Sequence, residues 1–512
     1  MAFDPCILQE TNADNRRDTL SAHVIVAPFT FGGHIIPAIR LAEALASSKH
    51  YLHITFVLPQ HLTPSDDHAH ASAPFDQLLQ SLQQNHPNVR LLGLPEESNG
   101  VITSVRHAFT HPESMQQPLE KLIGEIIAKA RPESPKVPVC IISDMLMSWT
   151  QDVANKYGIP RYVIYPGLAV SMAWVLYLPI LQAHRGLPLK SAKEFDTEED
   201  FITVPGLPPS HRREWNTLLL DTFPRSAQEV YVKNCLRTHE ASGILVDTFE
   251  ELESAAISAL ETATINPKKV PIYAVGPLLE ATHSDQPDLR PADANCLRWL
   301  DNQPPSSVVY VCFGSAYDPT ETQIQELALG LQHSDQLFLW VLRPGPGRTT
   351  GTDLSSFLPE EFLSRTHKQG LVLFDWAPQH LILSHPSIGA FFSHCGYNSM
   401  LETITMGLPV IGFPQFADHH LNCKLLVEEL GMGVEACRRE SDGLLERREV
   451  ERTVRLAMVK SEQRMSMRRK AKEWRDMALK AVTRMKAEVT EKNRESSKRS
   501  LESFIEDMLH TI

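Results

Sequence analysis

The N-terminal half of the chain alternates short apolar runs with segments of helical periodicity. The mostly apolar runs His23–Pro28 and His53–Leu58 fit buried strands, and the segment after Pro37 has apolar residues three and four positions apart, as on one face of a helix. Runs at Val137–Ser143 and Ile159–Tyr165 continue the alternation. Strands separated by helices form parallel sheets, so this half is predicted to be an α/β domain that opens with a β-α-β unit.

A second series of the same kind begins with Ser307–Phe313 and continues at Phe338–Leu342 and Leu371–Phe374. The polar, proline-bearing segment between the two series is typical of a domain linker. The pattern therefore predicts two similar α/β domains. The expected boundaries are a polar lead at 1–22, a first domain at 23–276, a linker at 277–294, a second domain at 295–460 and C-terminal helices at 461–512.

Two segments depart from this alternation. Pro179–Glu214 mixes proline, charged and aromatic residues without a clear period, which predicts a loop-rich insertion or a lid. Lys460–Arg499 is rich in lysine and arginine, and apolar residues from Trp474 to Val489 recur at helical spacing. This second pattern favours a packed helix with a solvated basic face over an anion-binding surface.

Composition narrows the class of protein. A chain of 512 residues that is 42% hydrophobic is too long for one ordinary domain and can bury a large core. Its formal net charge of −13 argues against a general nucleic-acid or anionic-membrane surface. The 8 cysteines include no CxxC pair, which favours free thiols in a reducing compartment.

The sequence also lacks targeting and membrane signals. The N-terminus has no apolar core of a signal peptide, and no apolar run approaches the roughly 20 residues of a membrane helix. We therefore expect a soluble, cytoplasmic protein that is a monomer and has no nucleic-acid partner.

The stretch Trp376–His419 carries the densest candidate chemistry. The apolar run Ile388–Ser393 fits a buried strand, the turn His394-Cys395-Gly396 interrupts it, and Asn398–Met406 has helical spacing. A second buried-strand run, Leu408–Pro414, follows. In such a strand-turn-helix-strand unit, the turn presents backbone N–H groups at the positive end of a helix, where a phosphate binds.

Side chains around this turn fit the parts of a nucleotide sugar. Gly396, Asn398 and Ser399 lie where the phosphate would bind, and His394 can add a side-chain donor. Glu402 lies one helical turn further on, where its carboxylate can accept from a pair of hydroxyls such as those of ribose.

The two ends of the stretch fit a base and a sugar. Trp376 lies on a loop fixed by Pro378 and offers a flat face for a base. Asp418 and His419 follow the second strand, close enough to reach a sugar.

At these positions the chain resembles a known family, the plant-type UDP-dependent glycosyltransferases (family 1) that act on small molecules. The resemblance rests on Trp376, Ala377, Pro378, Gln379, His394, Cys395, Gly396, Asn398, Ser399, Glu402, Gly407, Pro409, Pro414 and Asp418, which fall at the family's spacing. It implies an α/β fold of GT-B architecture, with two Rossmann-like domains facing each other across a cleft and a C-terminal helix packing back on the N-terminal domain. The N-terminal domain would bind the acceptor and the C-terminal domain the UDP-sugar.

Two positions depart from the family's pattern. Tyr397 stands where the family usually has tryptophan, and His419 stands where glucose-using members usually have glutamine. Both belong to the part that the resemblance assigns to the sugar, so the donor stays open: glucose is expected first, with galactose or a pentose as the alternative. Tyr397 is expected to act mainly through its backbone.

The resemblance implies an inverting transfer of the sugar to a hydroxyl of a small apolar acceptor such as a flavonoid, phenolic or terpenoid. His34, in the run Gly32-Gly33-His34, matches the family's general base. Asp144 matches the aspartate that holds and balances the imidazolium. The implied donor contacts are Ser315, Trp376, Ala377, Gln379, His394, Gly396, Tyr397, Asn398, Ser399, Glu402, Asp418 and His419.

No metal or other cofactor is expected beside the UDP-sugar co-substrate. The histidines and cysteines near the signature fall on different elements without a ligand-like interval on one helix face. The chain also lacks the Asp-x-Asp motif of the other glycosyltransferase architecture.

Other interpretations stay open: C-glycosylation, a sugar-nucleotide epimerase or hydrolase of the same fold, or an inactive UDP-sugar-binding protein. The presence of both His34 and Asp144 disfavours the inactive protein. A cleft mouth lined by Trp149, Trp174 and Tyr177 would suit a transferase with an apolar acceptor. A dehydrogenase is disfavoured because the first β-α turn lacks G-x-G-x-x-G.

Overall fold

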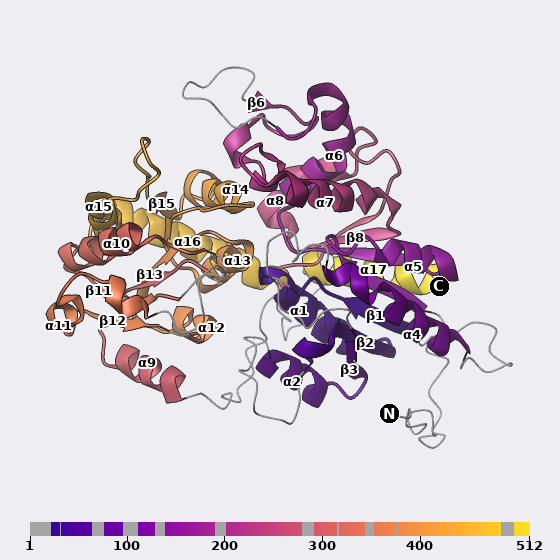
Figure 1. Cartoon of the computed structure of the whole chain (residues 1–512), viewed down its shortest axis with the longest axis horizontal. Coiled ribbons are helices and arrows are strands. Elements are labelled where there is room, and N and C mark those ends of the chain that lie inside the picture. The colour runs from indigo at the N-terminus through magenta and orange to yellow at the C-terminus, as the bar shows by residue number, and fades with distance from the viewer. Residues whose placement is uncertain are drawn as a thin grey trace.

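The structure of the chain is a computed structural model (Figure 1). It describes residues 22–30, 32–63, 76–95, 111–128, 139–189, 201–278, 291–314, 317–343, 353–374, 376–482 and 496–512. Nearly all of the predicted polar lead and most of the predicted linker lie outside these residues, so the domain boundaries stay predictions.

The first sheet is parallel, with the strand order β3-β2-β1-β4-β5-β8-β9 in the described chain. Its strands are β1 (Ala22–Ala27), β2 (Leu52–Pro59), β3 (Val89–Leu94), β4 (Val139–Asp144), β5 (Arg161–Tyr165), β8 (Gly243–Val246) and β9 (Ile272–Ala274). Its helices are α1 (Ile35–Ala46), α2 (Asp76–Asn85), α4 (Gln116–Ala128), α5 (Thr150–Tyr157), α6 (Ala169–Arg185), α7 (Arg225–Leu236) and α8 (Glu250–Leu260).

Alternate residues of β1 enter two separate cores. Val24 and Val26 pack with α1, whereas Ile25 and Ala27 pack with α4, α5 and α6. Because both faces of the strand are covered, its sequence is a continuous apolar run.

The second sheet is also parallel and has the order β12-β11-β10-β13-β14-β15. Its strands are β10 (Val308–Cys312), β11 (Leu337–Val341), β12 (Gly370–Leu373), β13 (Ile388–Ser393), β14 (Val410–Gly412) and β15 (Gly433–Glu435). The helices around it are α9 (Pro291–Asp301), α10 (Glu321–His333), α11 (Phe362–Thr366), α12 (Gln379–Leu383), α13 (Tyr397–Met406), α14 (His419–Lys424) and α15 (Arg447–Met458). The two-domain α/β prediction is confirmed.

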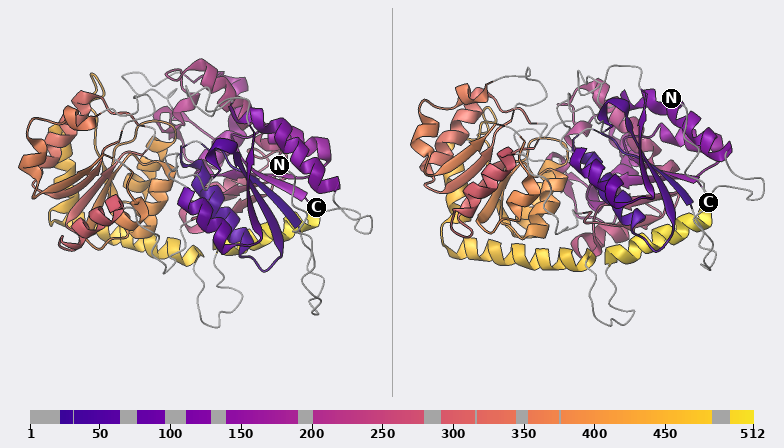
Figure 2. Two further views of the ribbon diagram at one scale, coloured as in Figure 1. Left: turned by 60° about the horizontal axis from the view of Figure 1, so that its bottom comes forward. Right: turned by 90° about the horizontal axis from the view of Figure 1, so that it is seen from below.

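The C-terminal helices connect the two domains. The helix α16 (Glu462–Val482) runs along the underside of the molecule, and α17 (Ser496–Thr511) lies beneath the first sheet (Figure 2). Phe504 and Met508 of α17 are fully buried in the core that contains Val24 and Val26. The expected return of the C-terminal end to the N-terminal domain is therefore present.

The segment Pro179–Glu214 was predicted as a loop-rich insertion, and this is wrong at its start. α6 continues through Pro179 to Arg185. Proline removes one helical hydrogen bond, but the apolar face of α6, including Leu178 and Leu181, is buried and stabilises the helix. Beyond it the described part contains only the two-residue strands β6 (Phe201–Ile202) and β7 (Ser210–His211) and the short 3₁₀ turn η6 (Arg212–Glu214).

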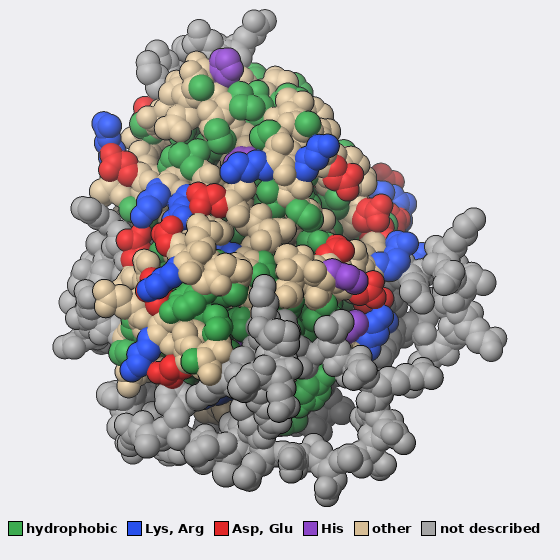
Figure 3. Space-filling model, turned by 90° about the vertical axis from the view of Figure 1, so that its right-hand side faces the viewer, with side chains coloured by type: hydrophobic (Ala, Val, Ile, Leu, Met, Phe, Trp, Pro, Cys, Tyr) green, Lys and Arg blue, Asp and Glu red, His purple; other side chains and the backbone are tan. Residues whose placement is uncertain are grey.

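The outer face of the N-terminal domain carries mixed charge. Figure 3 shows basic and acidic side chains interspersed with apolar ones rather than gathered by sign. Such a surface produces little net attraction for a polyanion.

Replacing Phe504 by alanine is expected to destabilise the N-terminal domain by about 3–5 kcal/mol, the usual cost of emptying a buried phenylalanine site. Its ring is fully buried and meets Tyr162 and Tyr273 edge-on, with centroids 5.0 and 5.3 Å away. Urea unfolding followed by circular dichroism measures the change, with the exposed Ser503→Ala on the same helix as control. Equal midpoints for both variants would contradict the docking of α17.

Candidate functional site

Each sheet has a point where the chain order reverses, between β1 and β4 in the first and between β10 and β13 in the second. Ligands of open parallel sheets bind outside the carboxyl ends of the strands at such points. Asp144 is the last residue of β4, and His34 ends the short turn that follows β1. The two predicted catalytic residues therefore lie at the reversal point of the first sheet.

His34 and Asp144 are in direct contact. His34 Nδ1 lies 2.9 Å from Asp144 Oδ2, and the Leu146 N–H donates to Asp144 Oδ1 at 2.8 Å. The Asp144 side chain is 1% exposed, whereas that of His34 is 32% exposed. A carboxylate on Nδ1 favours the tautomer that carries its proton there, which leaves Nε2 free to accept a proton.

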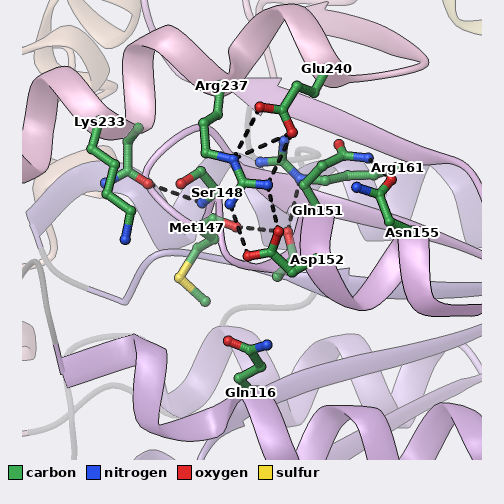
Figure 4. Close-up of polar contacts among 12 residues, drawn as sticks. Gln116, Met147, Ser148, Gln151, Asp152, Asn155, Arg161, Lys233, Arg237 and Glu240 are labelled. Atoms are coloured by element: carbon green, nitrogen blue, oxygen red, sulfur yellow. Dashed lines mark hydrogen bonds and ion pairs between the residues drawn. The ribbon is translucent and has the colours of Figure 1, made fainter.

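The buried side chain of Arg161 holds the end of β4 that carries Asp144. Arg161 Nε donates to Ser143 Oγ and Thr150 Oγ1, each at 2.8 Å, and Nη2 donates to the Asp144 carbonyl at 3.3 Å. Figure 4 shows Arg161 beside Arg237, whose guanidinium joins Asp152 and Glu240. Burial lowers the pKa of Arg161 to about 10, so it is still a cation at neutral pH.

The pKa of His34 is raised above its ordinary value. Burial acts to lower this pKa, but the charge and hydrogen bond of Asp144, together with the charge of Asp418, outweigh it. Asp418 belongs to the C-terminal domain, so carboxylates of both domains raise the pKa of His34.

The helix α13 begins at the predicted phosphate site. Gly396 is its N-cap residue, and the N–H groups of the first turn are not used within a helix. Cys395 has a φ of 61°, a left-handed conformation that is held by hydrogen bonds from Asn422 Nδ2 to its carbonyl and from its N–H to Ser393 Oγ. This turn aims the N-terminus of the helix at the domain boundary.

His394 is packed between two glycines. A Cβ atom at Gly314 would lie 2.6 Å from His394 Nε2, and Gly396 approaches the same ring. His394 Nδ1 is buried and has no hydrogen-bond partner in the described chain. Burial, reinforced by the charge of Arg343, lowers the pKa of His394 to about 4, so the ring is neutral.

Glu402, the predicted ribose contact, is held by the side-chain amide of Gln379. Gln379 Nε2 donates to Glu402 Oε2 at 2.6 Å and to Ser399 Oγ at 3.0 Å. Gln379, Glu402 and Ser399, which are all predicted to contact the UDP-sugar, therefore form one cluster. Ala377, by contrast, is buried in the core of the second sheet.

Sequence reasoning missed Arg343. Its guanidinium carbon lies 4.5 Å from the centre of the Trp376 ring, and Nη2 donates to the Gly314 carbonyl at 3.2 Å. Arg343 thus fixes one face of the tryptophan and the turn after β10. The only sequence signal was a cation just after the β11 run. Ser315, predicted on that turn, lies outside the described residues.

The predicted sugar residues lie at the start of α14. Asp418 Oδ2 accepts from Asn422 Nδ2 at 3.1 Å. Burial raises the pKa of Asp418, against the opposing effects of Asn422 and the charge of His34. His419 is buried, and its ring meets that of His394 edge-on with centroids 4.8 Å apart. Burial and the neighbouring His394 hold the pKa of His419 well below its usual range.

Two residues of α13 reach the N-terminal domain. Asn398 Nδ2 donates to the Gly33 carbonyl at 2.8 Å, directly before His34. The Tyr397 hydroxyl donates to the Asp247 carbonyl, so its side chain points into the domain interface. The contact agrees with the expectation that Tyr397 meets the donor through its backbone, but does not test it.

Two of the three aromatic residues expected at the mouth of the cleft lie in the core. Trp174 is 4% exposed and stacks on Trp215 at 4.5 Å between ring centroids, and Trp149 is 5% exposed. Tyr177 is half-buried against the same core. The expectation that these residues line the mouth is therefore wrong for Trp174, whose ring is covered by Trp215, and stays a prediction for Trp149 and Tyr177.

Comparisons with known proteins decide the family. The family model "UDP-glucoronosyl and UDP-glucosyl transferase" matches residues 288–446. UDP-glycosyltransferase 72B1 of Arabidopsis thaliana is 34% identical over 91% of this chain and 93% of its own length. The chain belongs to the UDP-glycosyltransferase family.

Two further similar proteins have names that mention a substrate or a bound ligand. Anthocyanidin 3-O-glucosyltransferase 5 of Manihot esculenta is 31% identical over 90% of this chain and 92% of its own. The crystal structure of Medicago truncatula UGT71G1 complexed with UDP-glucose superimposes with a TM-score of 0.77 at 28% identity, covering 96% of this chain and 98% of that one. This UDP-glycosyltransferase therefore has the GT-B fold, as expected.

The described residues contain no group of three or more His, Cys, Asp or Glu side chains placed to hold a metal ion. In the same part of the chain, no helix is both long and apolar enough to cross a bilayer.

The imidazole of His34 is expected to titrate above pH 6.5, because Asp144 stabilises its charged form. In Asp144→Asn the carboxylate is gone and burial dominates, so the His34 pKa should fall below that value. Histidine-selective NMR measures both, and the His34 signal is assigned by its loss in His34→Gln. An unchanged pKa in Asp144→Asn would contradict the coupling.

Proposed function

We propose that this UDP-glycosyltransferase moves a sugar, glucose by first choice, from a UDP-sugar to a hydroxyl of a small apolar acceptor such as a flavonoid, phenolic or terpenoid. The observation that carries the proposal is the meeting of His34 and Asp144 with Asp418 and the first turn of α13 at one domain boundary. A proton acceptor and an anion-binding helix end then serve one reaction centre.

The reaction is a direct displacement. The acceptor hydroxyl gives its proton to His34 Nε2 while its oxygen forms a bond to the anomeric carbon. The bond from that carbon to the diphosphate breaks, and its electron pair leaves with UDP. Asp144, bonded to Nδ1, balances the imidazolium. Attack from the face opposite the leaving group inverts the anomeric centre.

The C-terminal domain holds the donor. The α13 N-terminus, with Gly396, Asn398, Ser399 and His394, receives the diphosphate, since helix N-termini attract anions. Glu402, oriented by Gln379, accepts from the ribose hydroxyls. The ring of Trp376, which the guanidinium of Arg343 contacts, stacks on uracil. The proposed donor set also contains Ser315, Ala377, Tyr397, Asp418 and His419.

Glucose and a phenolic acceptor rest on the relatives. One is named for glucose transfer to the 3-hydroxyl of anthocyanidins, and another was crystallised with UDP-glucose. His419 stands where glucose-using members usually have glutamine, and its ring is neutral and buried, so galactose or a pentose is the alternative donor.

The proposal is tested by UDP release from purified protein in the presence of a chelator. A mixed panel of flavonoids, phenolics and terpenoids is combined with UDP-glucose, UDP-galactose, UDP-xylose and UDP-arabinose. Acceptor-dependent release is the expected result, fastest with UDP-glucose. Release without acceptor would instead support a hydrolase, and UDP binding without release a binding protein.

His34→Ala is expected to lower turnover by roughly 100- to 10,000-fold, the usual contribution of a positioned base. UDP affinity, measured by calorimetry, should change little because the proposed UDP contacts lie in the other domain. His184→Ala, an exposed histidine of the same domain, is the control. Wild-type turnover in His34→Ala would remove His34 from the mechanism.

A further inference from the structure

Two hydrogen bonds join the N-terminal domain to the loop that carries the proposed sugar residues. The Ala417 N–H donates to Thr217 Oγ1 at 2.7 Å, and the Thr217 N–H donates to the Ala417 carbonyl at 3.1 Å. The partners are 200 positions apart in the chain. This reciprocal pair, Thr217 with Ala417, is called the clasp below.

Thr217 is presented from a fixed support. The preceding Trp215 is fully buried, stacks on Trp174 and donates from Nε1 to Ser210 Oγ at 2.8 Å. Asn216 accepts from the Leu218 N–H at 3.0 Å, which caps the 3₁₀ turn η7 (Thr217–Leu219). Because Thr217 is itself held in place, it can fix the position of the Ala417 backbone.

Ala417 is the residue that needs fixing. Its φ of 55° lies in the left-handed region, which a residue with a side chain occupies only when its surroundings hold it there. Asp418 and His419 follow directly, and the His419 N–H donates to the Phe416 carbonyl at 3.2 Å. The conformation of Ala417 therefore sets the direction in which both side chains point.

A second contact holds the other end of the same helix. Lys424, the last residue of α14, forms an ion pair with Glu214 at 2.9 Å, and both side chains are mostly buried. The short helix that begins at the sugar residues is thus bound to the N-terminal domain at both ends. By contrast, the proposed contacts to base, ribose and diphosphate come from other elements of the C-terminal domain.

We propose that Thr217 is a positioning residue for the donor sugar: through the clasp, the acceptor-side domain sets the placement of Asp418 and His419. The proposal rests on the function proposed above. It separates the recognition of the sugar, which needs the clasp, from the recognition of UDP, which does not. It also makes the domain that binds the acceptor a determinant of which UDP-sugar is used.

Thr217→Val keeps the shape of the side chain but leaves the Ala417 N–H without its acceptor, whereas Thr217→Ser keeps the hydroxyl. Affinities for UDP-glucose and for UDP are measured by calorimetry without acceptor, and kcat/KM is measured with UDP-glucose and UDP-galactose. In Thr217→Val, affinity and kcat/KM for UDP-glucose should fall about tenfold, because the half-buried Ala417 N–H loses its acceptor. UDP affinity should be unchanged. The ratio of kcat/KM for UDP-glucose to that for UDP-galactose should move closer to one.

Thr217→Ser should behave like the wild type. So should Thr238→Val, which removes a buried hydroxyl of the same domain that bonds only within its own turn of the chain. Equal UDP-glucose affinity in Thr217→Val and Thr217→Ser would overturn the proposal. A parallel loss of UDP and UDP-glucose affinity would also overturn it, because the clasp would then serve domain docking alone.

The two proposals fail in different ways. A wild-type protein that never releases UDP in response to acceptor would refute the transferase, and the calorimetric comparison would still decide the clasp. An active wild type with an unaffected Thr217→Val would refute only the clasp.

Discussion

The hydrogen bond between His34 and Asp144 is the interaction on which the rest of the site depends. A buried carboxylate is stable only when its oxygens are bonded, and Asp144 has His34 on one oxygen and the Leu146 N–H on the other. The contact is possible because β1 and β4, far apart in the chain, are neighbours in the sheet. Because Asp144 is almost fully buried, water only weakly screens the attraction that keeps the imidazole oriented.

The domain boundary places residues of the C-terminal domain next to this pair. Asn398 at the start of α13 bonds the residue before His34, and Asp418 contributes to the charge that His34 experiences. The start of α13 therefore faces His34. The long helix α16 runs beneath the C-terminal domain to this boundary, where it contacts α8, and α17 lies beneath the first sheet (Figure 2).

Much of this arrangement could be predicted from the sequence because it follows local rules. Buried parallel strands appear as apolar runs, and the α13 unit has its own turn and its own glycine stop at Gly407. The membership of His34 in the site came from resemblance, since a histidine beside glycines is otherwise an ordinary loop residue. The predicted loop-rich insertion began too early at Pro179, because proline normally ends a helix and only tertiary burial overrides that rule in α6. Arg343 left only the weak signal of a cation after the β11 run, and Thr217 left none, because their partners are distant in the chain.

The configuration of the product at the anomeric carbon distinguishes direct displacement from a mechanism with two displacements. UDP-glucose carries an α-linked sugar, and a single displacement assisted by His34 must give a β-linked product. Proton NMR of the purified glucoside, recorded before any equilibration, reports the linkage through the coupling of its anomeric proton. A β-linked product is the predicted result. An α-linked product would require a second displacement or front-side attack, and would contradict direct transfer by the His34–Asp144 pair.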